Sequence, residues 1–278
     1  MFKKDLPFEA VKTEFADEQS KFIQIDGVEA HYKDEGEGKP ILLLHDLNTS
    51  LNEWNDLANH LREDFRVLRI DFPGFGLSSY NKNFDGKLDS FIYFIKKFIS
   101  ALRLDNMAVI GVGWGADIAW HYATLSPYLV EKLILINPTD HTSYHPFLYQ
   151  KMSKHWLGSF FYRWSGSKRI VRKRLKKWFH QTSFVNDERI GRYQSLLLKE
   201  GHRKSFMAAN KAKHRNRYDR LVKIETPTLL IVSDELGKNP IVKELPKAQV
   251  LHYKKVKLYP MIEASEQTNQ DVLKFLKK

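Results

Sequence analysis

The chain has 278 residues, of which 42% are hydrophobic and 13% aromatic, so it can bury a sizeable core and is not expected to be disordered. It contains no cysteine, which excludes disulfides, thiolate catalysis and cysteine-ligated metal sites. The formal net charge of +12 favours an anionic partner and leaves nucleic acid, membrane surface and acidic protein all open.

The hydropathy pattern indicates where in the cell the protein is expected. The first residues carry two lysines but no apolar run behind them, and nowhere do about 18 apolar residues follow one another. We therefore expect neither a signal peptide nor a membrane span. The default expectation is a cytoplasmic protein, with association at a membrane surface as the alternative.

Short apolar runs alternate with helical patterns along the chain, as in a mainly parallel sheet covered on both faces. The segment 22–36 predicts an opening hairpin that turns at Asp26 and Gly27. Buried strands are predicted over 41–46, 65–74, 107–113, 130–138 and 226–234, and a more polar, edge-like strand over 249–257. Helices are predicted over 51–63, 87–103, 114–126 and 266–277.

The alternation stops between residues 141 and 220. This stretch has a helical pattern and many aromatic residues, with roughly twenty Lys or Arg against about four Asp or Glu. We therefore predict two units: a core made of residues 1–140 and 221–278, and a basic helical cap inserted over 141–220.

Three segments carry a family resemblance: ILLLHDLNTSLNEW (41–54), RIDFPGFGLSS (69–79) and IGVGWGADIAWHYATLSPYLVEKLILINP (110–138). They resemble the oxyanion loop, the Asp-x-x-Gly-x-Gly-x-Ser turn and the nucleophile elbow of the α/β-hydrolase superfamily. The likeness is greatest to capped bacterial members and to the epoxide-hydrolase and haloalkane-dehalogenase branch. The resemblance implies an α/β fold: a doubly wound, mostly parallel eight-stranded sheet with an inserted helical cap.

The resemblance also locates the catalytic positions, and the residues found there cannot do the usual chemistry. In the elbow pattern Gly-x-nucleophile-x-Gly the nucleophile position is Gly113, which has no atom that can attack carbon. Leu236 falls at the position of the acid and Leu258 at that of the histidine. Asp46 replaces the glycine that usually follows the oxyanion-loop histidine, His45, and a carboxylate there would repel an oxyanion.

The cleft beside the elbow is expected to persist as a binding site. Its predicted lining consists of His45, Asp46, Leu47, Gly113 and Trp114. The expected ligand is a small apolar or lipid-like molecule, with a protein partner as the alternative, and no cofactor or metal ion is expected. The sequence therefore predicts a pseudohydrolase, a catalytically degenerate protein that still binds in the cleft.

An active hydrolase or lyase is the rival hypothesis. Asp140 follows the strand predicted over 130–138, where some relatives place their acid, and His141 and His145 lie close by in the sequence. Without a nucleophile these residues would have to activate water directly. For Asp140, a capping role in a Pro-Thr-Asp turn competes with catalysis. We interpret Asp71, at the end of another strand, as structural.

The basic segment supports a third hypothesis. Residues 168–178 put apolar side chains on one side of a helix and most of the positive charge on the other. Arg172, Lys173, Lys176 and Lys177 are the predicted contacts to an anionic membrane or polyanion, with a solvated outer face as the competing interpretation. Sequence-specific nucleic-acid binding is not predicted, because no motif of that class is present.

Overall fold

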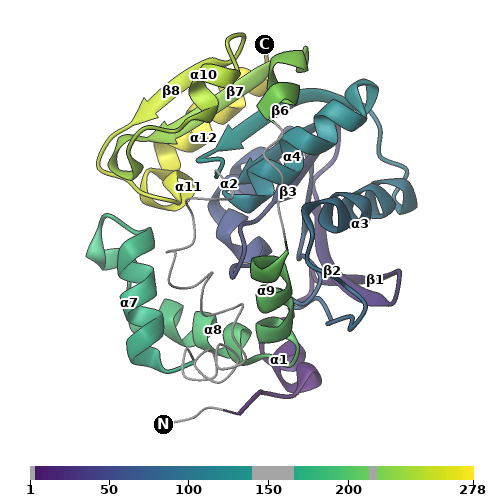
Figure 1. Cartoon of the computed structure of the whole chain (residues 1–278), viewed down its shortest axis with the longest axis vertical. Coiled ribbons are helices and arrows are strands. Elements are labelled where there is room, and N and C mark those ends of the chain that lie inside the picture. Colours follow the sequence, from purple (N-terminus) through teal and green to yellow (C-terminus); the bar gives the residue numbers. More distant parts are fainter. Residues whose placement is uncertain (1–3, 140–165, 213–217) are drawn as a thin grey trace.

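In the computed structural model, the chain is described over residues 4–139, 166–212 and 218–278. At its centre is an eight-stranded sheet with the strand order β1-β2-β4-β3-β5-β6-β7-β8 (Figure 1). The strands are β1 (Lys21–Ile25), β2 (Val28–Glu35), β3 (Pro40–Leu44), β4 (Arg66–Ile70), β5 (Met107–Val112), β6 (Val130–Ile136), β7 (Thr228–Ser233) and β8 (Gln249–Tyr253). β1, β2 and β4 pair antiparallel and the remaining pairs are parallel, so the predicted fold class is confirmed.

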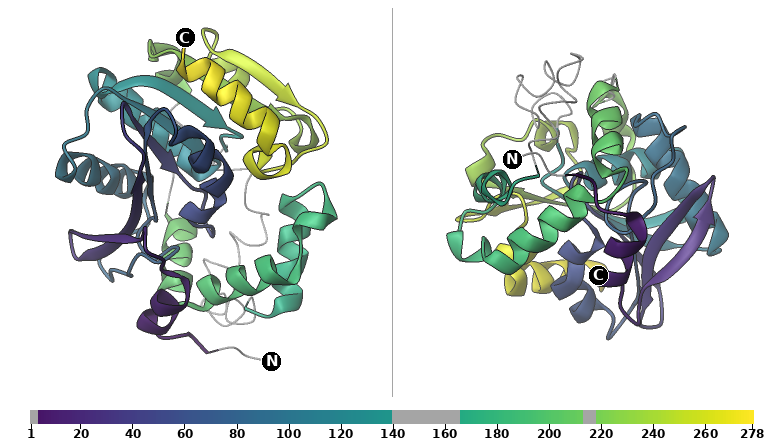
Figure 2. Two further views of the ribbon diagram at one scale, coloured as in Figure 1. Left: turned by 180° about the vertical axis from the view of Figure 1, so that it is seen from behind. Right: turned by 90° about the horizontal axis from the view of Figure 1, so that it is seen from below.

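The inner strands are apolar because helices cover both faces of the sheet. Every residue of β5 and of β7 is buried. α3 (Leu88–Ala101) packs on α4 (Trp114–Leu125) over one face, and α2 (Asn55–Leu61) packs on α12 (Ser265–Leu276) over the other (Figure 2). The other short elements are α1 (Phe8–Phe15), α10 (Ile241–Glu244), α11 (Pro260–Glu263), η1 (Leu51–Trp54), η2 (Pro127–Leu129), η4 (Tyr218–Lys223) and η5 (Asp234–Leu236).

Two predicted strands are shorter in the structure by four residues or more. β4 ends at Ile70, although the N–H of Asp71 still donates to the carbonyl of His31, and beyond this point the Asp71 side chain accepts from the N–H of Leu77 in the loop that follows. β8 ends at Tyr253 because the chain turns at Lys255, which has a φ of 58°. The helices α1, α10 and α11 lie in segments for which the sequence predicted none.

Between β6 and β7 the chain forms α7 (Lys168–Trp178), η3 (Thr182–Phe184), α8 (Asp187–Leu198) and α9 (His202–Lys211). The side chains of Ser167 and Asn186 cap the first turns of α7 and α8 by accepting backbone N–H bonds. α8 packs against both α7 and α9, and the three helices lie below the sheet in Figure 1. That residues 141–220 form a separate cap unit stays a prediction.

Within the described ranges, no helix has both the length and the apolar character needed to cross a bilayer.

Candidate functional site

The predicted elbow is present as a sharp turn from β5 into α4. Gly113 has a φ of 55° and a ψ of −119°, and α4 begins at Trp114. A Cβ on Gly115 would lie 2.1 Å from the carbonyl oxygen of Leu44, and one on Gly111 would lie 2.3 Å from that of Gly115. The flanking glycines therefore let the turn pack directly against the backbone of β3 and of α4 itself.

Asp46 fills the place where a nucleophile side chain would stand. Its Oδ1 accepts a hydrogen bond of 2.8 Å from the backbone N–H of Trp114. A Cβ on Gly113 would lie 2.5 Å from Oδ1 of Asp46 and 2.6 Å from its Cγ. Asp46 is fully buried. The carboxyl group thus occupies the space above the elbow and engages the N–H that the family uses as an oxyanion donor. The sequence predicted repulsion of an oxyanion, and the geometry adds a direct steric block.

A residue that the sequence did not single out also reaches this carboxyl group. The hydroxyl of Tyr259 lies 3.3 Å from Oδ2 of Asp46. The ring of Tyr259 packs against Trp178 and Phe179, with centroid separations of 6.1 Å and 5.6 Å. Tyr259 therefore joins the oxyanion loop to the end of α7. Its only sequence signal is its place one residue after the position predicted for the histidine.

The predicted histidine position is filled by an immobilised apolar residue. Leu258 is 2% exposed, and its N–H donates to the carbonyl of Trp178 at 3.0 Å. The carbonyl of Leu258 accepts from Nδ2 of Asn137, which also donates to the carbonyl of Lys257 and to Oγ of Ser233. The side-chain amide of Asn137 thus holds the ends of β6 and β7 and the loop after β8 together through hydrogen bonds. Nothing in this arrangement can take up a proton from a nucleophile.

The predicted acid position lies at the surface. Leu236 is 47% exposed. The neighbouring Asp234 pairs through Oδ1 with Nδ1 of His252 at 2.9 Å, and both side chains are exposed. The assignment of Leu236 and Leu258 to the triad positions stays a prediction.

His45 holds the loop that carries Asp46. Its Nε2 accepts from the N–H of Phe72 at 2.9 Å, so Nδ1 carries the hydrogen and donates to the carbonyl of Asp46 at 2.7 Å. Complete burial lowers the pKa of His45, outweighing the opposing charge of Asp71. Both ring nitrogens are therefore engaged in a neutral imidazole, which fixes the loop and leaves no free base. The adjacent Leu47 is buried as well.

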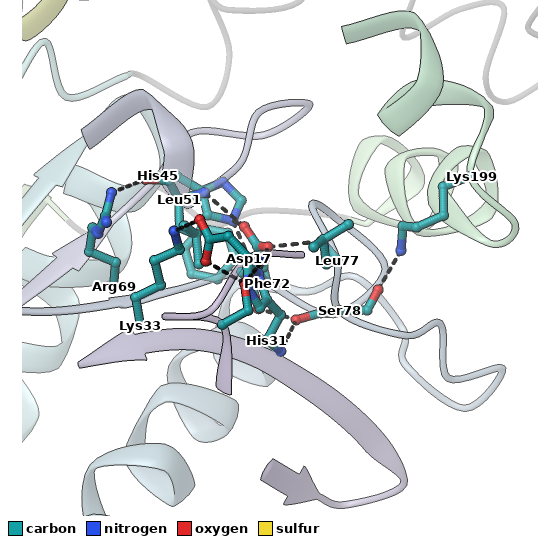
Figure 3. A network of polar contacts seen from close by, with 12 residues as sticks. Asp17, His31, Lys33, His45, Leu51, Arg69, Phe72, Leu77, Ser78 and Lys199 are labelled. Atoms are coloured by element: carbon teal, nitrogen blue, oxygen red, sulfur yellow. Dashed lines mark hydrogen bonds and ion pairs between the residues drawn. The ribbon is translucent and has the colours of Figure 1, made fainter. Parts of the chain in front are cut away.

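Asp71 is a structural hub, as the sequence suggested. Its partners His31, Leu51 and Leu77 are labelled in the polar network of Figure 3. Oδ1 of Asp71 accepts from the N–H of Leu51 at 2.7 Å, and its Oδ2 accepts from the N–H of Leu77 at 2.8 Å and contacts Nδ1 of His31 at 2.7 Å. Burial would raise the pKa of Asp71, but the hydrogen bond and charge of His31 bring it below its ordinary value. A Cβ on Gly76 would lie 2.0 Å from Cγ of Asp71, so the turn needs glycine there.

The alternative catalytic residues of the enzyme hypothesis, Asp140, His141 and His145, lie outside the described residues. Across the part of the chain that the structure describes, His, Asp and Glu side chains form no group of three or more that could hold a metal ion.

The amphipathic arrangement predicted for 168–178 is present in α7. Val171 and Leu175 are buried, whereas the four predicted anion contacts, Arg172, Lys173, Lys176 and Lys177, are exposed. These basic residues are therefore on the outer side of the helix and do not line the elbow.

Two enzymes of known class are similar to part of this chain. Epoxide hydrolase 4 of Mus musculus is 31% identical over 143 residues, which cover 50% of this chain and 40% of the relative. Haloalkane dehalogenase 2 of Mycobacterium tuberculosis is 36% identical over 107 residues, which cover 38% of this chain and 37% of the relative. The matched part thus spans less than half the length of these relatives.

Solved structures match over nearly the whole chain. Cfl2 from Burkholderia cenocepacia superimposes with a TM-score of 0.82 at 15% identity, covering 92% of this chain and 95% of its own. A meta-cleavage product hydrolase from Pseudomonas fluorescens gives a TM-score of 0.78 at 20% identity, covering 92% of this chain and 97% of its own. At these identities the likeness establishes the fold alone.

The family described as alpha/beta hydrolase fold matches residues 39–261. This range runs from β3 and the oxyanion loop through the elbow to the start of α11. The chain therefore belongs to the alpha/beta hydrolase fold family.

Proposed function

We propose that this protein is a catalytically degenerate member of its family, a pseudohydrolase that retains a site between elbow and cap for a ligand or partner. The observation that carries the proposal is the carboxyl group of Asp46 above Gly113. Oδ1 of Asp46 is an acceptor that already engages the N–H of Trp114. A substrate oxyanion would have to displace this bond, and no side chain at residue 113 is available to attack.

The chemistry of the described residues around the elbow supports the same proposal. Hydrolysis through a covalent intermediate needs a group that takes a proton from the nucleophile or from water. His45 is neutral with both ring nitrogens engaged, and Leu258 has no titratable atom. The hydroxyl of Tyr259, which contacts Asp46, is a weak base at neutral pH.

For the ligand, the described surroundings of the elbow favour an apolar molecule. Trp178 packs against Tyr259 and against Tyr193, with a centroid separation of 5.9 Å from the latter, so aromatic surface lines the contact between cap and core. Aromatic surface with a few polar groups is typical of sites for small apolar or lipid-like molecules. A protein partner is the alternative occupant of the same surface.

The first test is catalytic. Purified protein incubated with short p-nitrophenyl esters, epoxides and haloalkanes should show no turnover above a heat-denatured control. Gly113→Ser should not restore activity, because a serine without a base remains protonated and because its Cβ would collide with Asp46. Asp46→Asn, which keeps the size of the side chain, serves as the matched control and should be equally inactive.

Three results would count against the proposal. If the wild-type protein turns over a substrate and Asp140→Asn or His141→Ala abolishes that turnover, the enzyme hypothesis is established. Turnover lost in Asp46→Asn would make Asp46 a relocated nucleophile. A substrate-derived mass increase on the wild-type protein, absent from Asp46→Asn by intact-mass spectrometry, would show covalent capture by the same carboxylate without release.

A further inference from the structure

The outer side of α7 is a dense array of positive charge. We define the basic face by the exposed side chains of Lys168, Arg169, Arg172, Lys173, Lys176 and Lys177. Arg172 pairs with Asp187 at 2.6 Å; for the others, no acidic partner lies within ion-pair distance among the described residues. A helix rises 1.5 Å per residue, so these charges gather within about 15 Å, and neighbours one turn apart, about 5.4 Å, lie within the screening length of about 8 Å at physiological salt. Their mutual repulsion is relieved when an anionic surface neutralises them.

The apolar side of α7 is already occupied. Val171 and Leu175 are buried, and Trp178 packs against Tyr193 and Tyr259. An amphipathic helix that inserts into a bilayer must turn its apolar side toward the lipid. α7 could do this only by leaving its packing against α8 and the core. Contact of α7 with a membrane must therefore be electrostatic adsorption of the basic face without insertion.

The same face is a poor match for single-stranded nucleic acid. Such binders alternate basic residues with aromatic side chains on which bases stack. Within α7 no aromatic side chain is exposed, because Trp178 packs against Tyr193 and Tyr259. Binding to an anionic lipid surface needs only a cluster of basic residues close to the lipid head groups.

We propose that the basic face of α7 adsorbs this protein to membranes that carry anionic lipids. Trp178, the last residue of α7, contacts Tyr259, which in turn contacts Asp46. Adsorption of the basic face therefore leaves α7 between the membrane and the elbow. The proposal uses side chains that do not contact Asp46 or Gly113, so it stands or fails separately from the loss of catalysis.

The experiment is co-sedimentation of the full chain with vesicles of phosphatidylcholine alone and vesicles that also contain phosphatidylserine. The wild type should bind only the second kind, and binding should be reversed at about 1 M salt, where the screening length falls to about 3 Å. Lys173→Glu/Lys176→Glu/Lys177→Glu breaks no described ion pair and should weaken binding on the order of a hundredfold, since each basic residue at the surface contributes roughly fivefold.

The matched control is Lys96→Glu/Lys243→Glu/Lys274→Glu, which makes the same change in net charge at exposed positions of α3, α10 and α12. It should bind within a few-fold of wild type, and thermal unfolding of both triple variants checks that they are folded. If both triple variants lose vesicle binding equally, the binding depends on net charge alone and the proposal is overturned. Equal binding of the wild type to neutral vesicles, or tighter binding to an oligonucleotide than to phosphatidylserine vesicles at the same salt, would also overturn it.

Discussion

At the scale of single residues, two departures from the family pattern fit each other sterically. The carboxyl group of Asp46 can lie over the elbow only because residue 113 has no Cβ, which would be 2.5 Å from Oδ1 of Asp46. Conversely, a side chain at residue 113 would need a smaller residue in the oxyanion loop. Gly113 also has a φ of 55°, a conformation that costs other residues energy. The two positions are therefore expected to be energetically coupled.

A double-mutant cycle measures this coupling. Gly113→Ala should lower the free energy of unfolding by about 2–4 kcal/mol, from backbone strain and from the collision with Asp46. In an Asp46→Gly background the collision disappears and only the strain remains, so the same substitution should cost about 1–2 kcal/mol less. Urea unfolding of the four proteins checks this. Additive effects of the two substitutions would show that Asp46 does not stand over the elbow.

The sequence identified Gly113 and Asp46 as anomalies but did not predict their contact. Trp114 and Asp46 are 68 residues apart in the chain, and Tyr259 lies 213 residues after Asp46. The motif predicts which residue takes the nucleophile position because the elbow is a local pattern with glycines at fixed spacing. The direction of a side chain that replaces a glycine depends on tertiary packing, which no local pattern encodes.

At the scale of elements, the strands and long helices were predictable because apolar periodicity reports burial directly. The short α1, α10 and α11 have too few residues for such a period to show. The sequence also gave no signal that the residue after α8 would enter the core. Lys199 is fully buried, and its Nζ donates to the carbonyl of Ser78 in the turn that follows β4. This bond ties the end of α8 to the core.

Burial of Lys199 predicts a pH dependence of stability. Desolvation lowers the pKa of Lys199 from 10.5 to about 8. Between about pH 8 and pH 10.5 the amino group of Lys199 is protonated in the unfolded chain and neutral in the folded protein. The free energy of unfolding therefore rises with pH across this window. Below it, burying the charged amino group lowers the free energy of unfolding.

Lys199→Met tests this prediction. The variant should be more stable than wild type at neutral pH by on the order of 2 kcal/mol, offset in part by the lost bond to Ser78. The advantage should shrink as the pH rises from about 8 toward 10.5. Lys96→Met, at an exposed position of α3, is the control and should show no such trend. A stability difference between wild type and Lys199→Met that does not change across the window would contradict the prediction.

At the scale of the whole molecule, a buried carboxylate on α11 joins the helices inserted after β6 to the core. Oε1 of Glu263 accepts from the N–H of His180 at 2.6 Å and of Gln181 at 2.9 Å, and its Oε2 accepts from the N–H of Lys257 at 2.8 Å. Glu263 is 7% exposed. One side chain thus fixes the chain just after α7 against the loop after β8.

Glu263→Ala should therefore loosen the cap selectively. Its loss removes three hydrogen bonds to a charged acceptor, each of which contributes about 1.5–3 kcal/mol. If α7 to α9 form a unit that opens separately from the sheet, amide exchange measured by mass spectrometry should accelerate over 168–198 and stay unchanged in β5. Glu244→Ala, at an exposed position of α10, should change neither region. Equal acceleration in β5 would mean that cap and core open together, and the prediction of two units would be wrong.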